Sequence, residues 1–428
     1  HHCGYGQIQK QSSMEHNYLK NGFWARSMDE ELKNPGLFVE QLVYMEDVTN
    51  SLVNSGDEFK AIEAALIEAK ESNNPDLIYK VVPFFNNNQF FLLATIKYND
   101  VRLVGAPPSS IGKFGADTDN WVFPRHTGDF SLFRVYDDNG NAFIPNQHLK
   151  VNIAPRTPGE FTMIFGYPGR TQEYLTAVQM DQLVNVENAR RVEIRDILLS
   201  IMDGEMRSDA EVQLKYASKY ARIANGWKKW IGQIEGVQFS KGLDRKRKLE
   251  AEFTARIAAD ANLWDKYSGL LAEIAVNNTQ IAEGQLKRNE FIETVYYGIE
   301  WFSLVSKLQS AKSDVDMKVE LNAFHQNYSR TVSEKTTAAM LSLALKTFPG
   351  LLGDMDEATF VRSVHNEVDT LIELATKDQS IDLETVAPAA NKFNQAAFQS
   401  FYTVSPSNNL LQKATELSAE YMRALMEV

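Results

Sequence analysis

Proline is distributed very unevenly along the chain, and this distribution limits the possible folds more than any other feature of the sequence. The chain has 428 residues and 13 prolines, of which ten lie between Pro35 and Pro168 and none between residues 169 and 348. Proline breaks the interior of helices and favours turns. The sequence therefore predicts an α+β fold, in which a loop-rich β region is followed by a long helical region.

Short runs of β-branched and aromatic residues predict antiparallel strands in the first region, because Asn, Asp and Gly separate them as in tight turns. The predicted strands are residues 78–85, 88–98, 101–104, 130–136 and 161–165. A turn is expected at residues 137–140, which read Asp-Asp-Asn-Gly. Two helices are expected between the strands, one opened by a capping box at residues 27–30 and one at residues 59–70.

Helical periodicity dominates the second region. An apolar stripe with the spacing of one helix face is formed by Ile194, Ile197, Leu198 and Ile201. A capping box at residues 208–211 is expected to open the next helix. Amphipathic segments continue over residues 243–260 and 267–302 and from Pro349 to the end. No repeat with a period of about 20–50 residues is visible, so the helices are expected to form a bundle or cap and not a solenoid.

Composition excludes several classes of function. Lys and Arg total 44 against 56 Asp and Glu, which gives a formal net charge of −12. Because phosphate binding needs a positive surface, we expect no nucleic-acid partner, and we interpret the charged run at residues 244–248 as a solvated helix face. No apolar run approaches the roughly 20 residues that cross a bilayer, so we expect no membrane insertion.

The cysteine and histidine content argues against a metal site. Cys3 is the one cysteine of the sequence, so the chain can form neither an internal disulfide nor a thiolate cluster. Four histidines lack the spacing of metal ligands and are interpreted as surface or capping residues: His16, His148, His325 and His365. We expect neither a metal nor an organic cofactor.

Two short sequence motifs together suggest nucleophilic catalysis. A histidine followed by cysteine occurs at His2, and Asp129 opens an apolar strand further along the chain. Two-barrel serine peptidases order their triad in this way, as His, then Asp, then Ser. A neutral imidazole accepts the proton of the serine hydroxyl, and a buried carboxylate orients the imidazole. Spacing alone also fits chance, because both motifs are short.

Five longer motifs resemble those of the bacterial family of dipeptidyl peptidases 7 and 11. They are His-His-Cys-Gly-Tyr-Gly at residues 1–6, Gly-Phe-Trp-Ala at 22–25, Thr-Asp-Asn-Trp at 118–121, Pro-Arg-His-Thr-Gly-Asp-Phe-Ser-Leu-Phe-Arg at 124–134 and Phe-Gly-Tyr-Pro-Gly-Arg-Thr at 165–171. The resemblance implies a serine exopeptidase with a chymotrypsin-like double β-barrel and a large inserted helical domain. It implies that residues 1–182 belong to the first barrel half and residues 183–428 to the helical domain.

The resemblance also assigns roles to individual residues. It makes His2 the general base, with His1 as a minor alternative, and Asp129 the acid that orients it. It implies that Asn120 and Trp121 hold the free N-terminal amine of the substrate, joined by Asn225 of the helical domain. An amide oxygen accepts hydrogen bonds from an ammonium group, and an indole forms a wall for the first residues. The alternatives are a core aromatic for Trp121 and a helix cap for Asn225.

The serine expected for this chemistry is missing from the sequence. Neither G-x-S-x-G nor G-[DN]-S-G occurs, and the serines at Ser55 and Ser268 stand in unsuitable surroundings. The chain is therefore expected to be a fragment, cut at both ends and inactive as it stands, with Cys3 paired to a cysteine upstream.

The resemblance further implies an intact enzyme that acts on oligopeptides, forms a homodimer and resides in the periplasm or at the cell surface of a Gram-negative bacterium. Two alternatives stay open: a non-catalytic peptide-binding homologue and a trypsin-like endopeptidase.

Overall fold

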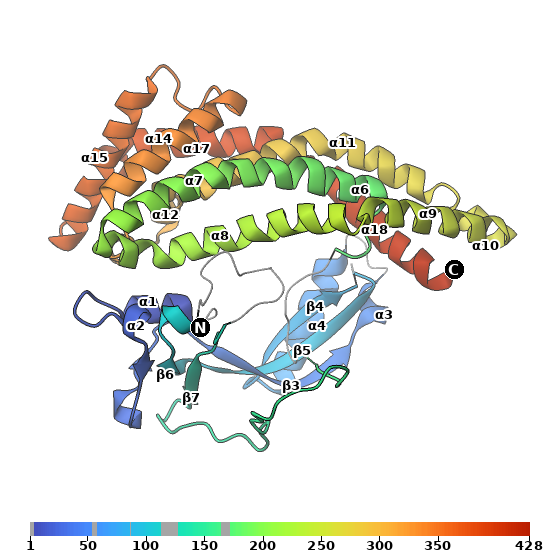
Figure 1. The fold of residues 1–428 in the computed structure, drawn as a ribbon, viewed down its shortest axis with the longest axis horizontal. Coiled ribbons are helices and arrows are strands. Elements are labelled where there is room, and N and C mark those ends of the chain that lie inside the picture. Colours follow the sequence, from blue (N-terminus) through green and yellow to red (C-terminus); the bar gives the residue numbers. More distant parts are fainter. Residues whose placement is uncertain (1–3, 54–57, 86, 113–126, 164–171) are drawn as a thin grey trace.

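The computed structural model describes residues 4–53, 58–85, 87–112, 127–163 and 172–428. A strand-rich region lies on one side of the molecule, and a layered helical region lies on the other (Figure 1). The long helix α8, Ala210–Phe239, forms the lowest layer of the helical region and faces the strands. The predicted α+β class is confirmed, and the predicted division at residues 182 and 183 stays a prediction.

Among the residues that the structure describes, seven strands form two antiparallel sheets. They are β1 Phe23–Trp24, β2 Leu32–Lys33, β3 Val39–Asp47, β4 Ile78–Phe84, β5 Gln89–Tyr98, β6 Asp100–Ala106 and β7 Leu132–Tyr136. In one sheet β6 pairs with β1, β2 and β7, and in the other β5 lies between β3 and β4. Within the described residues both sheets are open, and no closed barrel is formed.

The strand predictions are confirmed in four of five places. Strands β4, β5, β6 and β7 match the predicted ranges within two residues, and the turn after β7 closes through Gly140, whose N–H donates to the Asp137 carbonyl. The prediction at 161–165 is wrong for residues 161–163, which form no strand, and its remaining residues lie outside the described ranges. The helix expected at residues 27–30 is a single 3₁₀ turn, η1 Met28–Glu30, without a side-chain cap from Ser27.

The helices fall into two groups. Those in and around the strand region are α1 Tyr5–Gln11, α2 Tyr18–Asn21, α3 Thr49–Leu52, α4 Phe59–Asn73 and α5 Ser109–Gly112. The helical region contains α6 Ala177–Asp181, η3 Gln182–Asn188, α7 Ala189–Ser208, α8, α9 Gly242–Ala258, α10 Ala261–Tyr267, α11 Leu270–Phe291, η4 Ile292–Tyr296, α12 Glu300–Ser310, α13 Asp314–His325, α14 Arg330–Thr347, α15 Glu357–Thr376, α16 Leu383–Val386, α17 Pro388–Val404 and α18 Asn408–Glu427. The segments η3 and η4 are π-helical.

The main core lies inside the helical region. It extends from α7 through α12, α14 and α15 to α17, with Trp301, Phe302 and Phe393 at its centre. A smaller cluster under α4 fills the space between that helix and the sheet of β4 and β5. A third, small cluster joins the two regions, because Ile8 of α1 and Leu103 of β6 pack with Ala217 of α8. This junction holds the N-terminal segment against the helical layer.

Two details of the predicted helices are corrected. The N-cap of α8 is Asp209 and not Ser208, since the Asp209 carboxylate accepts from the backbone N–H groups of Glu211 and Val212. In α7, Ile194 and Leu198 are fully buried, whereas Ile197 is 40% exposed. The buried face of α7 instead includes a charged residue, Arg195.

Candidate active site

The segment that carries Asp129 is tied to its surroundings just before β7. The Thr127 hydroxyl donates to the carbonyl of Gly112 over 3.0 Å, and the N–H of Gly128 donates to the carbonyl of Ile111 over 3.0 Å. Asp129 itself is half-buried and makes interactions of its own. The aspartate is thus held three residues before the start of β7, and its role stays a prediction.

The N-terminal segment lies directly against this part of the chain. Gly4 is buried, and a Cβ atom added to it would stand 2.6 Å from Oγ of Ser131 and 3.3 Å from the ring of Phe133. Only glycine permits so close an approach. Gly4 follows His2 by two residues, and Ser131 follows Asp129 by two residues. The fold therefore brings together the two segments that carry the predicted base and its aspartate.

Helix α1 connects this segment to the helical region through one buried amide, that of Gln9. Its Nε2 donates to the carbonyl of Lys215 over 2.9 Å and to Oδ1 of Asn327 over 3.0 Å. Its Oε1 accepts from the backbone N–H of Ser218 over 2.8 Å. Gln9 is 7% exposed, so this contact is protected from water. The amide fixes the position of α1 along α8.

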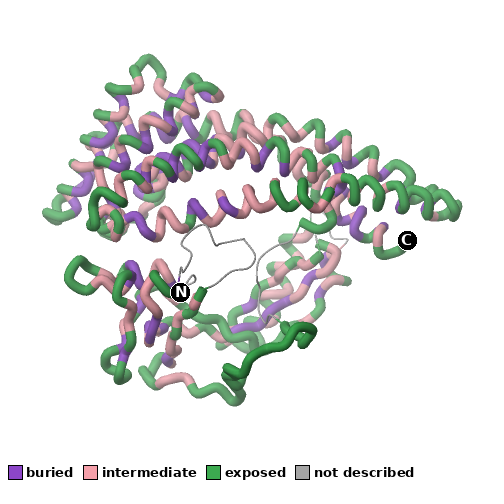
Figure 2. The backbone as a smooth tube through the Cα atoms, in the orientation of Figure 1, coloured by how far each residue is buried: buried purple, intermediate pink, exposed green. Residues whose placement is uncertain are grey.

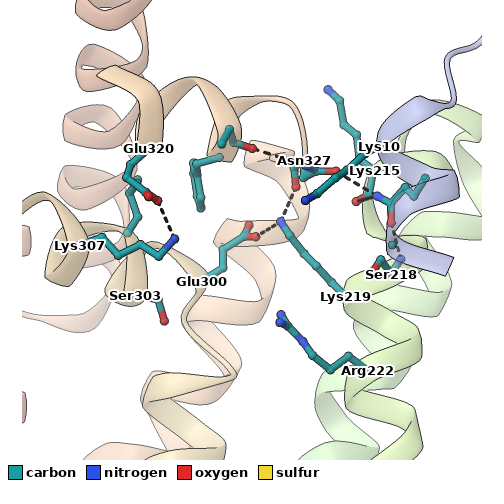
Figure 3. A pocket seen from close by; sticks show the side chains of 15 residues that line it. Lys10, Lys215, Ser218, Lys219, Arg222, Glu300, Ser303, Lys307, Glu320 and Asn327 are labelled. Atoms are coloured by element: carbon teal, nitrogen blue, oxygen red, sulfur yellow. Dashed lines mark hydrogen bonds and ion pairs between the residues drawn. The ribbon is translucent and has the colours of Figure 1, made fainter. Parts of the chain in front are cut away.

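A pocket of about 290 Å³ lies beside this contact, between α1, α8, α12 and α13 (Figure 3). Its walls are charged and largely paired: Lys219 bonds to Glu300 over 2.5 Å and to the carbonyl of Asn327, and Lys307 pairs with Glu320 over 2.6 Å. Tyr216 also donates to Glu300 over 2.6 Å, and burial raises the pKa of its phenol. Because these charges are engaged with one another, the pocket acts as part of the junction.

Asn225 lies in the middle of α8 and is half-buried. The alternative role as a helix cap is therefore wrong. It follows Ser218 by seven residues, or about two helical turns, and so lies on the same face of α8 as the residue that meets Gln9. This face points toward the N-terminal segment.

Several predicted residues lie outside the described ranges. They are His1, His2, Cys3, Ser55, Asn120 and Trp121. The pairing of His2 with Asp129, the amine-binding role of Asn120 and Trp121, and the core alternative for Trp121 therefore stay predictions. Ser268 is exposed and directly follows α10, and α10 lies at the opposite end of the molecule from β7 (Figure 1).

One of the histidine predictions is wrong. His16, His148 and His325 are exposed as expected, but His365 is fully buried in α15. Its Nδ1 lies 2.7 Å from the carbonyl of Val361 and its Nε2 lies 3.0 Å from Oγ of Ser333. Burial, the largest cause, lowers the pKa of this imidazole. The residue is a buried core histidine and not a surface or capping residue.

Sequence reasoning missed two residues that organise the site, Gln9 and Arg195. Gln9 lies in a mostly polar helix, so nothing local marked it, whereas Arg195 interrupts the apolar stripe of α7. A charged residue among the apolar positions of a helix face is the signal that was available for Arg195. In the part of the chain that the structure describes, no cluster of three or more His, Cys, Asp or Glu could hold a metal ion. Among those residues, no helix has the length and apolarity for crossing a membrane.

The chain is similar to several known dipeptidyl peptidases. An Asp/Glu-specific dipeptidyl-peptidase of Capnocytophaga gingivalis is 41% identical over 75% of this chain and 48% of its own length. Dipeptidyl-peptidase 7 of Phocaeicola vulgatus is 35% identical over 82% of this chain and 53% of its own length. The crystal structure of Porphyromonas endodontalis DPP11 with the dipeptide Arg-Asp matches with a TM-score of 0.84 at 28% identity, covering 100% of this chain and 68% of that chain.

The chain spans about half the length of the curated relatives that it matches. The model of the family described as peptidase S46 matches residues 1–424. Nearly the whole sequence is thus accounted for by one family, and the chain belongs to peptidase family S46.

Proposed function

We propose that this chain supplies the general base, its orienting aspartate and part of the amine-binding site of a serine-type dipeptidyl peptidase. The observation that carries the proposal is the contact of Gly4 with Ser131, which juxtaposes the segments of His2 and Asp129. The relatives in family S46 named dipeptidyl-peptidases support the same activity.

In this proposal His2 accepts the proton of a serine hydroxyl while Asp129 fixes the imidazole tautomer and stabilises the imidazolium. The serine comes from outside these 428 residues, since the sequence lacks a motif typical of a nucleophilic serine, such as G-x-S-x-G or G-[DN]-S-G. The reaction is acyl transfer to the serine followed by hydrolysis, and it needs no metal.

The amine anchor explains why dipeptides would be released. Asn120, Trp121 and Asn225 together hold the ammonium group of the substrate, and α8 covers that end of the cleft. The distance between the anchor and the triad then leaves room for two residues before the scissile bond. The anchor sets the length of the product as well as its affinity.

The proposal is tested on the complete open reading frame with fluorogenic dipeptides that carry free or acetylated N-termini. One of the relatives is named Asp/Glu-specific, and the side-chain preference of this chain is open, so substrates with acidic and with apolar second residues are both offered. We expect cleavage of the free form only. Asp129→Asn should lower kcat by about 10⁴-fold, as the same change does in a Ser-His-Asp triad. The matched control is Asp138→Asn in the exposed turn after β7, which should leave kcat unchanged.

Asn225→Ala should lower kcat/KM for free-amine substrates by about 10- to 100-fold, the loss of a hydrogen bond to a charged group. Asn409→Ala, at an exposed position of α18, is its control. Equal cleavage of free and acetylated peptides would contradict the amine anchor and point to an endopeptidase. Binding of peptides without any cleavage would instead identify a peptide-binding homologue.

Two further properties belong to this proposal on the family resemblance alone, a homodimeric state and a location in the periplasm or at the cell surface. Light scattering of the intact enzyme and fractionation of the source cells test them.

A further inference from the structure

The side of α8 that faces α7 is held by one buried guanidinium, that of Arg195. Its Nη1 donates to the carbonyl of Ile223 over 2.6 Å, and its side chain is 6% exposed. Ile223 precedes Asn225 by two residues in the same helix. A buried arginine of α7 is therefore hydrogen-bonded to the turn of α8 that carries Asn225, the predicted ligand of the substrate's amine.

Glu293 fixes this guanidinium from the other side. The pair is bidentate, with Nε to Oε2 at 2.6 Å and Nη2 to Oε1 at 3.1 Å, and the Glu293 side chain is 4% exposed. The rings of Trp230 and Tyr297 lie 4.3 Å and 5.1 Å from the guanidinium carbon. Glu293 belongs to the π-helical segment η4, and π-helical turns are frequent at functional sites.

The two residues that follow Asn225 also contact α7. A Cβ atom at Gly226 would overlap Nη1 of Arg195, so glycine is what allows the guanidinium to reach the Ile223 carbonyl. The indole Nε1 of Trp227 donates to Oδ1 of Asp196, the residue after Arg195, over 2.7 Å. The segment Ala-Asn-Gly-Trp at residues 224–227 is thus held against two consecutive residues of α7, Arg195 and Asp196.

Asn225 itself is turned away from this anchor. The guanidinium lies over Gly226, and one residue in a helix corresponds to a rotation of about 100°, so Asn225 lies on a different side of α8 from the guanidinium. That side also carries Ser218, which meets Gln9 of α1. A buried ion pair adds little net stability, because its desolvation offsets most of its attraction, but it constrains geometry.

We propose that Arg195, Glu293 and Gly226 are positioning residues that set the rotation of α8 and thereby direct Asn225 toward the substrate's N-terminal ammonium. This inference rests on the proposed function, in which Asn225 binds that ammonium. In this arrangement the ion pair keeps the amine anchor rigid, so that the distance between the anchor and the triad fixes the length of the product.

The test is a double-mutant cycle in the intact enzyme between Gly226→Ala and Asn225→Ala. We expect Gly226→Ala to raise KM for a free-amine dipeptide substrate by about 10-fold with little change in kcat, since it misplaces a binding group. In the Asn225→Ala background the same change should have no further effect on KM. Gly236→Ala is a matched control in α8, because a Cβ there meets nothing within 4 Å, and it should leave KM unchanged.

A second variant covers the case in which Gly226→Ala does not fold. Glu293→Gln keeps the shape of the side chain but loses the ion pair, and it should raise KM in the same Asn225-dependent way. Arg195→Lys should not restore a normal KM, because lysine lacks the planar fork that meets Glu293 and Ile223 together.

Each failure has a separate signature. Equal losses from Gly226→Ala in both backgrounds would overturn the positioning role, as would an unchanged KM in a folded variant. No effect of Asn225→Ala alone, in an enzyme that still rejects acetylated substrates, would remove Asn225 from the anchor and the inference with it. Absence of any cleavage by the wild-type enzyme would refute the proposed function itself.

Discussion

The helical region and the strand region bury their apolar side chains in different ways. In the helical region one large cluster surrounds Trp301, Phe302 and Phe393, all of which are at most 2% exposed, and a second, smaller cluster lies between α9, α11 and α18. In the strand region the buried residues form two small clusters, and strand β3 leaves Leu42, Val43 and Met45 at 46–50% exposure. Figure 2 shows the same contrast, with an exposed stretch after β7.

The difference teaches where each region obtains its stability. Amphipathic helices that follow one another along the chain can cover their own apolar faces. A sheet with an exposed apolar face needs another layer against it, and large apolar patches mark contact surfaces. The sheet that contains β6 has such a contact, since α1 and β6 pack against α8. The exposed residues of β3 belong to the other sheet, which this contact does not cover.

The largest expected effect separates the two regions physically. We expect residues 177–428 expressed alone to be soluble and to unfold cooperatively in urea, because their core is internal. Residues 4–176 alone should aggregate or lack a cooperative transition, as followed by circular dichroism. A cooperative transition of residues 4–176 at the midpoint of the full chain would break the comparison.

The next prediction measures the helical core. Trp301 is 0% exposed, with the rings of Phe393 and Phe360 centred 5.2 Å and 6.0 Å away. Trp301→Ala should lower the free energy of unfolding by about 3–5 kcal/mol, since it leaves a cavity. Trp264, which is 45% exposed, provides the control, and Trp264→Ala should cost less than about 1 kcal/mol. Similar costs for both would deny that the helical core is closed.

The sequence revealed the elements whose signals are local. The proline-free stretch and the helical period located the helical region, and short β-branched runs located β4 to β7. Strand β3 was missed because its polar and apolar residues do not alternate cleanly. It forms through pairing with β5 from Val39↔Tyr98 to Asp47↔Phe91, which depends on residues far along the chain.

The sequence predicted the site only as separate short motifs, without the contacts that bring them together. The resemblance named Asp129 and Asn225, but nothing local shows that Gly4 meets Ser131, because that contact joins segments more than a hundred residues apart. The partners of Arg195 were hidden for the same reason. The position of this arginine in an apolar stripe is unfavourable until Glu293 and the Ile223 carbonyl compensate its charge.

A polar contact sharpens the comparison for the strand region. The buried carboxylate of Glu31, at 1% side-chain exposure, accepts from Arg134 and from Tyr136, each over 2.7 Å. Glu31→Gln should lower the free energy of unfolding of the whole chain by about 1.5–3 kcal/mol, since it weakens hydrogen bonds to a charged group. The control Glu40→Gln breaks the more exposed pair with Lys80 and should cost about 0–1 kcal/mol. If Glu31→Gln has no effect, specific polar contacts do not compensate for the small apolar clusters of this region.

The smallest effect concerns the pH dependence of the helical region. His365 is buried between Val361 and Ser333, and burial holds its pKa below the ordinary value of 6.5. The folded state thus binds a proton less readily than the unfolded chain. The stability contributed by the neutral imidazole is fully present above pH 6.5 and is lost as the pH falls toward the lowered pKa.

Urea unfolding at several pH values between about pH 8 and about pH 5, which bracket the histidine range, measures this loss. In His365→Gln the decline in unfolding free energy below pH 6.5 should become shallower than in the wild type. His325→Gln, at the exposed end of α13, should leave the slope as it is. An unchanged slope in His365→Gln would mean that the helical core accommodates a charged imidazole, and the contrast with the more open strand region would then rest on apolar packing alone.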